Sequence, residues 1–180
     1  MTICIAYKDK NSGNIICASD SCSTIGASKH LVKPIKIYEK NGIVYLSSGT
    51  SGFIQTLMLN FDYSLPKIYD NIDNVVKGDF KIKLKEFCRE NDLLDENNTL
   101  PNNLLIIINK RIYVVCSSFT IVESYHNYMA IGSGMDIAIG VLYALENDDT
   151  KTIKEKIEIA INACNEFSSG CDNRIQWMEV

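Results

Sequence analysis

The sequence has no long apolar run. None of its apolar stretches approaches the roughly 20 residues that a membrane-spanning helix needs. Its first residues also lack the basic segment and the longer apolar core of a secretory signal. Both absences argue against a membrane or secreted protein and favour a cytoplasmic one.

An excess of positive charge is missing as well. The chain has 18 Lys and Arg against 22 Asp and Glu, a formal net charge of −4, and the two signs are interspersed. Nucleic-acid-binding proteins concentrate basic residues on one face. We therefore expect neither nucleic acid nor a membrane as a partner.

The spacing of cysteines and histidines argues against a metal site and against a catalytic histidine. The seven cysteines include no Cys-x-x-Cys pair and no Cys/His spacing typical of a metal site, so we expect no metal and no cofactor. Several cysteines lie inside apolar strand or helix patterns, as buried thiols do in a reduced compartment. The only histidines, His30 and His126, stand in polar or loop settings, which argues against a His-based triad.

The apolar content is that of a compact globular protein. With 180 residues and 46% apolar side chains, the chain is long enough to bury a sizeable core and too apolar to be disordered. The simplest organisation is a single domain over residues 1–180.

The N-terminus contains a candidate nucleophile. Thr2 follows Met1 directly and precedes an apolar, β-branched run that predicts a strand. Methionine before a small residue is the usual substrate of methionine aminopeptidase, so the mature chain could begin at Thr2. An N-terminal α-amine has a pKa of about 7.7 to 8.0 and can take the proton of its own hydroxyl. The alternative is an ordinary first strand.

Three further polar features stand at strand ends or within strands. Asp20 closes a buried strand, and Lys36 lies between two isoleucines of another. Ser48-Gly49 joins a strand to a helix, where unpaired backbone N–H groups can bind an anion or an oxyanion. The alternatives are a turn cap for Asp20, a solvent-facing Lys36 and a plain tight turn.

Turn residues and apolar spacing predict an order of strands, two helices, strands, two helices and a last strand. The expected strands are residues 2–8, 15–19, 33–38, 43–47, 104–109, 111–117, 121–122, 128–131 and 174–180. The expected helices are one from residue 53 that ends before 65, then 80–88, 137–145 and 150–167, with a polar run over 21–26 and a polar loop over 95–103. Hairpin-built sheets with paired helices predict an α+β fold, a four-layer αββα sandwich.

Five motifs share their order and spacing with one known family. They are Ala18-Ser19-Asp20-Ser21, Lys36-Ile37-Tyr38, Ser47-Ser48-Gly49-Thr50, Ala130-Ile131-Gly132-Ser133-Gly134 and Glu166-x-x-Ser169-Gly170. On these the chain resembles the proteasome β-subunit and HslV peptidases, which are N-terminal nucleophile (Ntn) hydrolases. It is most similar to small proteasome-like proteins of bacteria and phages. The resemblance covers nearly the whole chain and is weakest over residues 64–103.

The resemblance implies roles for the first three polar residues. Thr2 would be nucleophile and base together. Lys36 would lie beside its hydroxyl and lower the cost of forming the alkoxide. Asp20 would pair with Lys36 and act only through it.

The same resemblance implies a supporting shell. The backbone N–H groups of the Ser48-Gly49 turn would bind the oxyanion. Ser133, together with Glu166 and Ser169, would orient the Thr2 amine. In this chain Ser48 replaces a glycine of the family, and Glu166 replaces an aspartate.

The function implied is that of a threonine-type peptidase that assembles in a homo-oligomeric ring. Its substrate would be a peptide or an unfolded protein, and an ATP-dependent unfoldase is a possible partner. Two alternatives stay open: a catalytically silent assembly protein that retains Met1, and an amidase acting on a small amide. The intact mass of the mature protein would show whether Met1 is removed.

Overall fold

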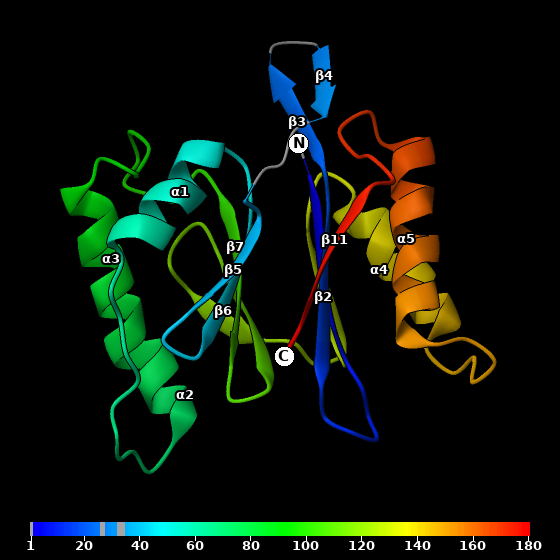
Figure 1. The fold of residues 1–180 in the computed structure, drawn as a ribbon. Helices are drawn as coiled ribbons and strands as arrows, with labels where there is room; N and C mark the ends of the chain where they lie inside the picture. Colours follow the sequence, from blue (N-terminus) through cyan, green and yellow to red (C-terminus); the bar gives the residue numbers. More distant parts are fainter. Residues whose placement is uncertain (1, 26–27, 32–34) are drawn as a thin grey trace.

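Two sheets stack face to face, and helices cover the outer face of each (Figure 1). The computed structural model describes residues 2–25, 28–31 and 35–180. The layers therefore run helix, sheet, sheet, helix, and the predicted αββα sandwich is confirmed.

The first sheet contains the N-terminal strand at its centre. Its order is β10-β1-β2-β11, with every neighbour antiparallel. The strands are β1 (Ile3–Lys8), β2 (Ile15–Asp20), β10 (Tyr128–Gly132) and β11 (Ile175–Glu179). Because β1 is covered by helices on one face and by the second sheet on the other, its sequence is apolar at nearly every position instead of alternating.

The second sheet is an antiparallel meander. Its order is β5-β6-β7-β8-β9, formed by β5 (Ile37–Lys40), β6 (Ile43–Ser48), β7 (Asn103–Ile108), β8 (Arg111–Val115) and β9 (Ile121–Glu123). The β5–β6 connection is the predicted Asn41-Gly42 turn. Both residues have positive φ angles, 53° and 75°, as a two-residue hairpin turn requires.

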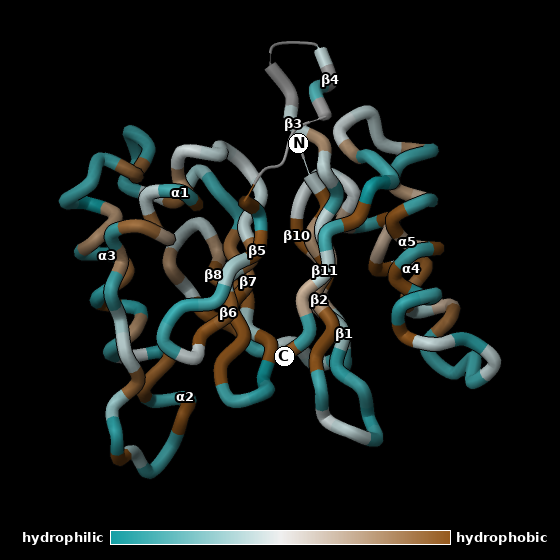
Figure 2. The backbone as a smooth tube through the Cα atoms, viewed as in Figure 1, coloured by the Kyte–Doolittle hydropathy of each residue, from teal (hydrophilic) through white to brown (hydrophobic). Residues whose placement is uncertain are grey.

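Each sheet has its own helical layer. The first sheet is covered by α4 (Met135–Leu145) and α5 (Ile153–Phe167), and the second by α1 (Ser51–Asn60), α2 (Ile72–Asn74), the π-helical segment η1 (Val75–Phe80) and α3 (Lys81–Glu90). Figure 2 shows the apolar residues concentrated on the strands and the polar ones on the outer helices and turns. The core thus has three parts, one between the sheets and one beneath each helical layer.

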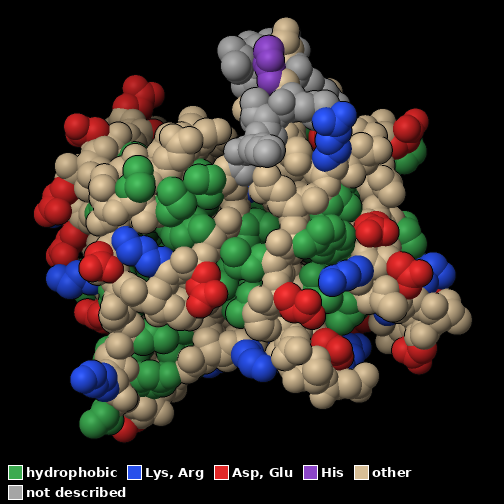
Figure 3. All heavy atoms as spheres, in the orientation of Figure 1, with side chains coloured by type: hydrophobic (Ala, Val, Ile, Leu, Met, Phe, Trp, Pro, Cys, Tyr) green, Lys and Arg blue, Asp and Glu red, His purple; other side chains and the backbone are tan. Residues whose placement is uncertain are grey.

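The surface is mixed in charge. Acidic and basic side chains are interspersed over the face drawn in Figure 3. No helix within the described ranges is long and apolar enough to cross a membrane. Six of the seven cysteines are buried, and Cys116 is half-buried.

A small hairpin replaces the polar run expected after Asp20. It consists of β3 (Cys22–Ile25) and β4 (Ser28–Leu31), and it projects beyond the ends of the two sheets (Figure 1). A hairpin outside the core needs no apolar alternation, so the sequence pattern gave no sign of it.

Lys36 lies just before β5, not within a strand as predicted. Residues 33 and 34 of that predicted strand are outside the described residues. The Lys36 carbonyl still accepts the Ser47 N–H at 3.0 Å, so pairing with β6 extends one residue past the strand. Its side chain, however, turns toward Asp20.

Two helix starts also differ from the prediction. Helical structure begins at Ile72 rather than at residue 80, because burial of Val75, Val76 and Phe80 outweighs the poor helix propensity of the intervening residues. The last helix begins after Thr152 rather than at Thr150.

Candidate active site

Thr2 lies immediately before β1, at the end of an inner strand, and is buried. Its carbonyl accepts the Ser133 N–H at 2.9 Å and the Ser133 hydroxyl at 3.4 Å. Gly132 makes this approach possible: its φ is 110°, and a Cβ there would lie 2.0 Å from the Thr2 carbonyl oxygen. The end of β10 therefore holds the Thr2 backbone in place.

A buried ion pair stands beside Thr2. Lys36 Nζ lies 2.8 Å from Asp20 Oδ1, with Asp20 fully buried and Lys36 only 6% exposed. The carboxylate also accepts the Ile3 N–H at 2.9 Å and the Cys22 N–H at 3.2 Å, while Lys36 Nζ donates to the Cys22 carbonyl at 2.6 Å. Both charges are hydrogen-bonded on more than one side, as a stable buried pair requires.

One cavity of about 370 Å³ joins these groups to the turn after β6. It is lined by Thr2, Cys22, Ser23, Ile35, Lys36, Ser47, Gly49, Thr50, Ser51 and Ile54. The candidate nucleophile, the cation and the Gly49 backbone thus face the same space, although they come from three separate segments. Ser48, in contrast, is buried and does not line the cavity.

The positive charge of Lys36 also acts on the thiol of Cys4, two residues after Thr2. Burial raises the pKa of Cys4; the positive charge of Lys36 opposes that rise, and the negative charge of Asp20 adds to it. The same attraction to Lys36 would favour an alkoxide on Thr2, because a unit charge acts more strongly in a water-poor pocket than in bulk solvent. Of this ion pair, only Lys36 lines the cavity, so its charge is the one placed to stabilise developing negative charge there.

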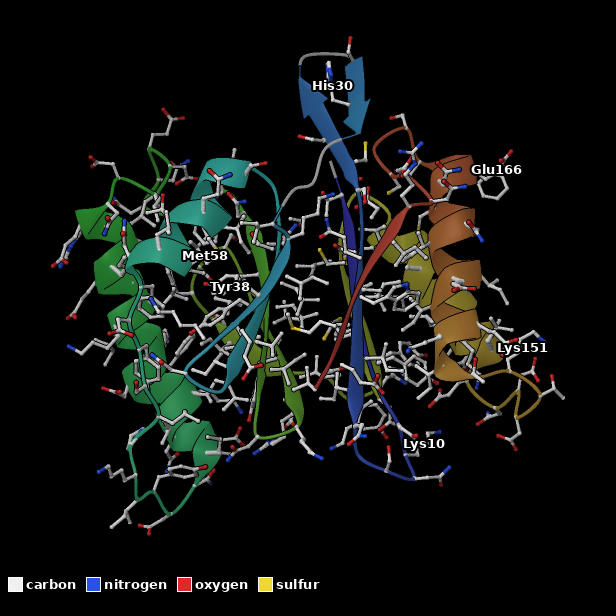
Figure 4. All side chains as sticks on the ribbon, viewed as in Figure 1. Lys10, His30, Tyr38, Met58, Lys151 and Glu166 are labelled. Carbon is white, nitrogen blue, oxygen red and sulfur yellow. The ribbon has the colours of Figure 1, made fainter. Side chains whose placement is uncertain are left out.

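Glu166 and Ser169 are not brought to Thr2. Both are exposed, and neither forms a hydrogen bond with Thr2 in the described part of the chain. Figure 4 places Glu166 at the C-terminal end of α5, in the outer layer. The reason is helical geometry: Cys164 faces the core, and a residue two positions later points to the opposite side of the helix. Their role in orienting the amine stays a prediction.

Two thiols that the sequence reasoning missed lie behind Ser133. The Ser133 hydroxyl is 3.8 Å from Cys171 Sγ, and Cys164 Sγ donates to the Gly134 carbonyl at 3.2 Å. Hydrogen bonding to Cys164, Ser168 and Ser133 lowers the pKa of Cys171, against the effect of burial. Ser133 is therefore backed by a thiol where the resemblance predicts a carboxylate. The position of Cys171, directly after Gly170, was the only sign of it in the sequence.

Neither a metal centre nor a histidine site coincides with this cavity. In residues 2–25, 28–31 and 35–180, no group of three or more His, Cys, Asp and Glu side chains is placed to hold a metal ion. His30 lies on the β3–β4 hairpin (Figure 4), and His126 stacks on Tyr128 with ring centroids 5.2 Å apart. Neither histidine is among the residues that line the cavity.

Solved structures with the same fold are known. BPH from Thiobacillus denitrificans superposes with a TM-score of 0.81 at 22% identity, over 100% of this chain and 97% of that one. HslV from Trypanosoma brucei has a TM-score of 0.73 at 14% identity, over 99% and 98% of the two chains. An Anbu mutant from Hyphomicrobium sp. strain MC1 has a TM-score of 0.71 at 13% identity, over 98% and 80%.

The chain has the fold of these three proteins, a four-layer αββα sandwich. No protein-family model matches the sequence, and no curated protein is significantly similar to it. At 13 to 22% identity the structural likeness establishes the fold alone. The activity has to be argued from the residues of this chain.

Proposed function

We propose that this protein is a threonine-type peptidase that cleaves peptide bonds with Thr2, exposed by removal of Met1, within a homo-oligomeric ring. The observation that supports it most is the shared cavity, where Thr2, Lys36 and Gly49 meet. Met1 itself lies outside the described residues, so its removal is part of the proposal.

The chemistry follows from these groups. The free Thr2 amine takes the hydroxyl proton, and Oγ attacks the peptide carbonyl carbon to give a tetrahedral oxyanion. The Lys36 charge favours the developing alkoxide, and backbone N–H of the Ser48-Gly49 turn binds the oxyanion. The protonated amine then gives its proton to the leaving nitrogen as the C–N bond breaks. Water hydrolyses the resulting ester on Thr2.

The structural neighbours support the substrate class. One solved structure of BPH from Thiobacillus denitrificans is a complex with epoxomicin, and it has a TM-score of 0.81 to this chain. Epoxomicin is therefore a ligand to test here. We further propose that peptides or unfolded proteins are the substrates and that an ATP-dependent unfoldase delivers them.

A silent assembly role is the second candidate. It is favoured by the exposed positions of Glu166 and Ser169, which leave the surroundings of the Thr2 amine different from those implied by the resemblance. An intact mass that includes Met1 would favour the silent assembly role over the peptidase, because Thr2 then has no free amine.

The test is release of a fluorophore from peptide amides by the Met-free protein. Thr2→Ala and Lys36→Met should each lower kcat/KM by about a thousandfold or more, as loss of a nucleophile or its activating group does. Lys40→Met is the matched control, since Lys40 is a partly exposed lysine that bonds the Met58 carbonyl away from the cavity. A threonine-directed covalent inhibitor should add its mass to Thr2 alone. Met-free protein that neither turns over peptides nor accepts the label would overturn the proposal.

A further inference from the structure

Asn102 lies behind the turn that closes the cavity. It directly precedes β7 and is only 2% exposed. Its Nδ2 donates to the carbonyls of Ser48, at 3.1 Å, and Thr50, at 3.2 Å, while its Oδ1 accepts the Thr50 hydroxyl at 3.1 Å. A flipped amide would turn its oxygen toward both carbonyls, so this set of bonds fixes its orientation.

The bond to Ser48 controls a neighbouring N–H group. The Ser48 carbonyl and the Gly49 N–H belong to one planar trans peptide, in which C=O and N–H point in opposite directions. A carbonyl held toward Asn102 therefore directs the Gly49 N–H away from Asn102. Gly49 lines the cavity that Thr2 also lines. Accepting a hydrogen bond at the carbonyl also polarises the peptide, which strengthens its N–H as a donor.

Gly49 and Asn102 fit each other closely. Gly49 has φ of 125°, and a Cβ at this position would lie 2.3 Å from Asn102 Nδ2. Only a glycine lets the amide come this near the turn. The turn is therefore shaped around the Asn102 side chain, which comes from a distant part of the sequence.

We propose that Asn102 is a positioning residue of the peptidase reaction, which aims and strengthens the Gly49 N–H as the oxyanion donor without touching the substrate. The inference rests on the proposed function and adds to it a residue that neither the motifs nor the resemblance includes.

Asn102→Asp tests this most directly. The change is nearly isosteric, yet it replaces the two donors by an oxygen that repels the Ser48 and Thr50 carbonyls. Loss of one oxyanion donor costs about a hundred- to a thousandfold in kcat. We expect a drop of about a hundredfold, with KM changed less than about twofold. Asn103→Asp is the matched control, because it adds the same charge one residue later on an exposed side chain and should stay near wild type.

A pair of inhibitors separates positioning from general structural damage. A peptide aldehyde gives an oxyanion when Thr2 attacks it, whereas the corresponding peptide alcohol fills the same cavity without one. Asn102→Asp should weaken aldehyde binding by about the same factor as kcat and leave alcohol binding unchanged. Equal weakening of both inhibitors would show a merely structural role and overturn the inference.

Thr50→Val provides a second variant should Asn102→Asp fail to fold. It removes only the hydroxyl that bonds Asn102 Oδ1, from an exposed residue, and should lower kcat about fivefold with the same inhibitor pattern. If the variants that fold have the kcat and the aldehyde affinity of the wild type, the inference about Asn102 is overturned. The proposed peptidase function is not affected by that result. A wild-type protein without turnover or aldehyde binding would overturn the proposed function and this inference together.

Discussion

Asp20 does more than the sequence predicts for it. The resemblance gives it a role only through Lys36, and that role stays a prediction; its carboxylate also accepts the backbone N–H groups of Ile3 and Cys22. It therefore ties together the start of β1, the start of β3 and the Lys36 ammonium. The bond to Cys22, two residues later, is the local turn cap that the sequence offers as an alternative. Ile3 and Lys36 are distant in the sequence, so no turn or spacing rule reveals that they meet at the same carboxylate.

Asp20→Ala should consequently destabilise the whole protein as well as abolish turnover. Removing one partner of a buried pair leaves an uncompensated charge and costs about 3 to 5 kcal/mol. Urea unfolding of the variant, beside Lys36→Met, measures the effect. Asp20 keeps two N–H donors in Lys36→Met, so that change should cost less. An Asp20→Ala protein as stable as wild type would contradict the account of this junction.

At the scale of elements, the start of α5 shows how two similar threonines differ. Thr152 forms a capping box with Glu155: its hydroxyl accepts the Glu155 N–H at 3.3 Å, and the Glu155 carboxylate accepts the Thr152 N–H at 2.7 Å. The Thr150 hydroxyl instead bonds Asp148. The predicted start at Thr150 is therefore wrong, and the helix begins after the threonine that has a glutamate three residues later.

Thr152→Ala should lower the free energy of unfolding by about 1 kcal/mol, the usual cost of losing an N-cap side chain. Thr150→Ala is the paired control and should cost less than about 0.5 kcal/mol, as surface changes do. Thermal and urea unfolding of the two variants give the comparison. Equal losses would mean that the helix begins earlier than the structure has it.

A second element-scale feature links β8 to its neighbours. Arg111 on β8 binds Glu123 on β9, with Nε 2.7 Å from Oε1, and Asp73 on α2 at 3.1 Å. Hydrogen bonding by Arg111 lowers the pKa of Glu123 below its ordinary value. A carboxylate with a lowered folded pKa adds stability above its unfolded pKa of about 4.3, and that stability is lost as the pH falls through the folded pKa.

Arg111→Met should therefore destabilise the protein by about 1 kcal/mol near pH 7, a size typical of partly exposed ion pairs. The difference from wild type should shrink as the pH falls below about 4. Urea unfolding at pH 7 and pH 3 measures it. Lys110→Met is the control, because the Lys110 ammonium donates to the uncharged Asn14 side chain, and it should show no such dependence. A loss that is constant with pH would contradict the assignment.

At the scale of the whole molecule, the outer helices expose large side chains. On α4 and α5, Tyr143 is 66% and Phe167 78% exposed. The other helical layer exposes large side chains as well, with Leu59 69% and Ile82 55% exposed. Exposed apolar side chains on these helices are available for the contacts between copies that the proposed ring requires.

We accordingly expect sedimentation at micromolar concentration to give a mass several times that of the 20.2 kDa chain. Phe167→Glu should lower that mass or weaken the assembly, because it would place a charge in the apolar contact between copies that the ring requires. Lys154→Glu, on the same helix at an exposed position, is the control for charge alone. A monomer at these concentrations would count against the ring.

Much of the fold could be predicted because the apolar pattern of each segment shows which of its faces is buried. The apolar run of β1, the Asn41-Gly42 turn and the apolar stretch of α4 show their structure within a few residues. Together with the order of elements, they determine the αββα layers. The motif at Gly132-Ser133-Gly134 likewise places small residues where the end of β10 meets Thr2.

The sequence by itself thus determined the layers and the candidate nucleophile, cation and turn. Only the tertiary structure decided which side chains surround them: Asn102 behind Gly49, Cys171 behind Ser133, and Glu166 turned to solvent. The physical reason is the range of the interactions. Periodicity and turn chemistry act within a few residues, whereas a hydrogen bond between distant segments depends on how whole sheets and helices pack against each other.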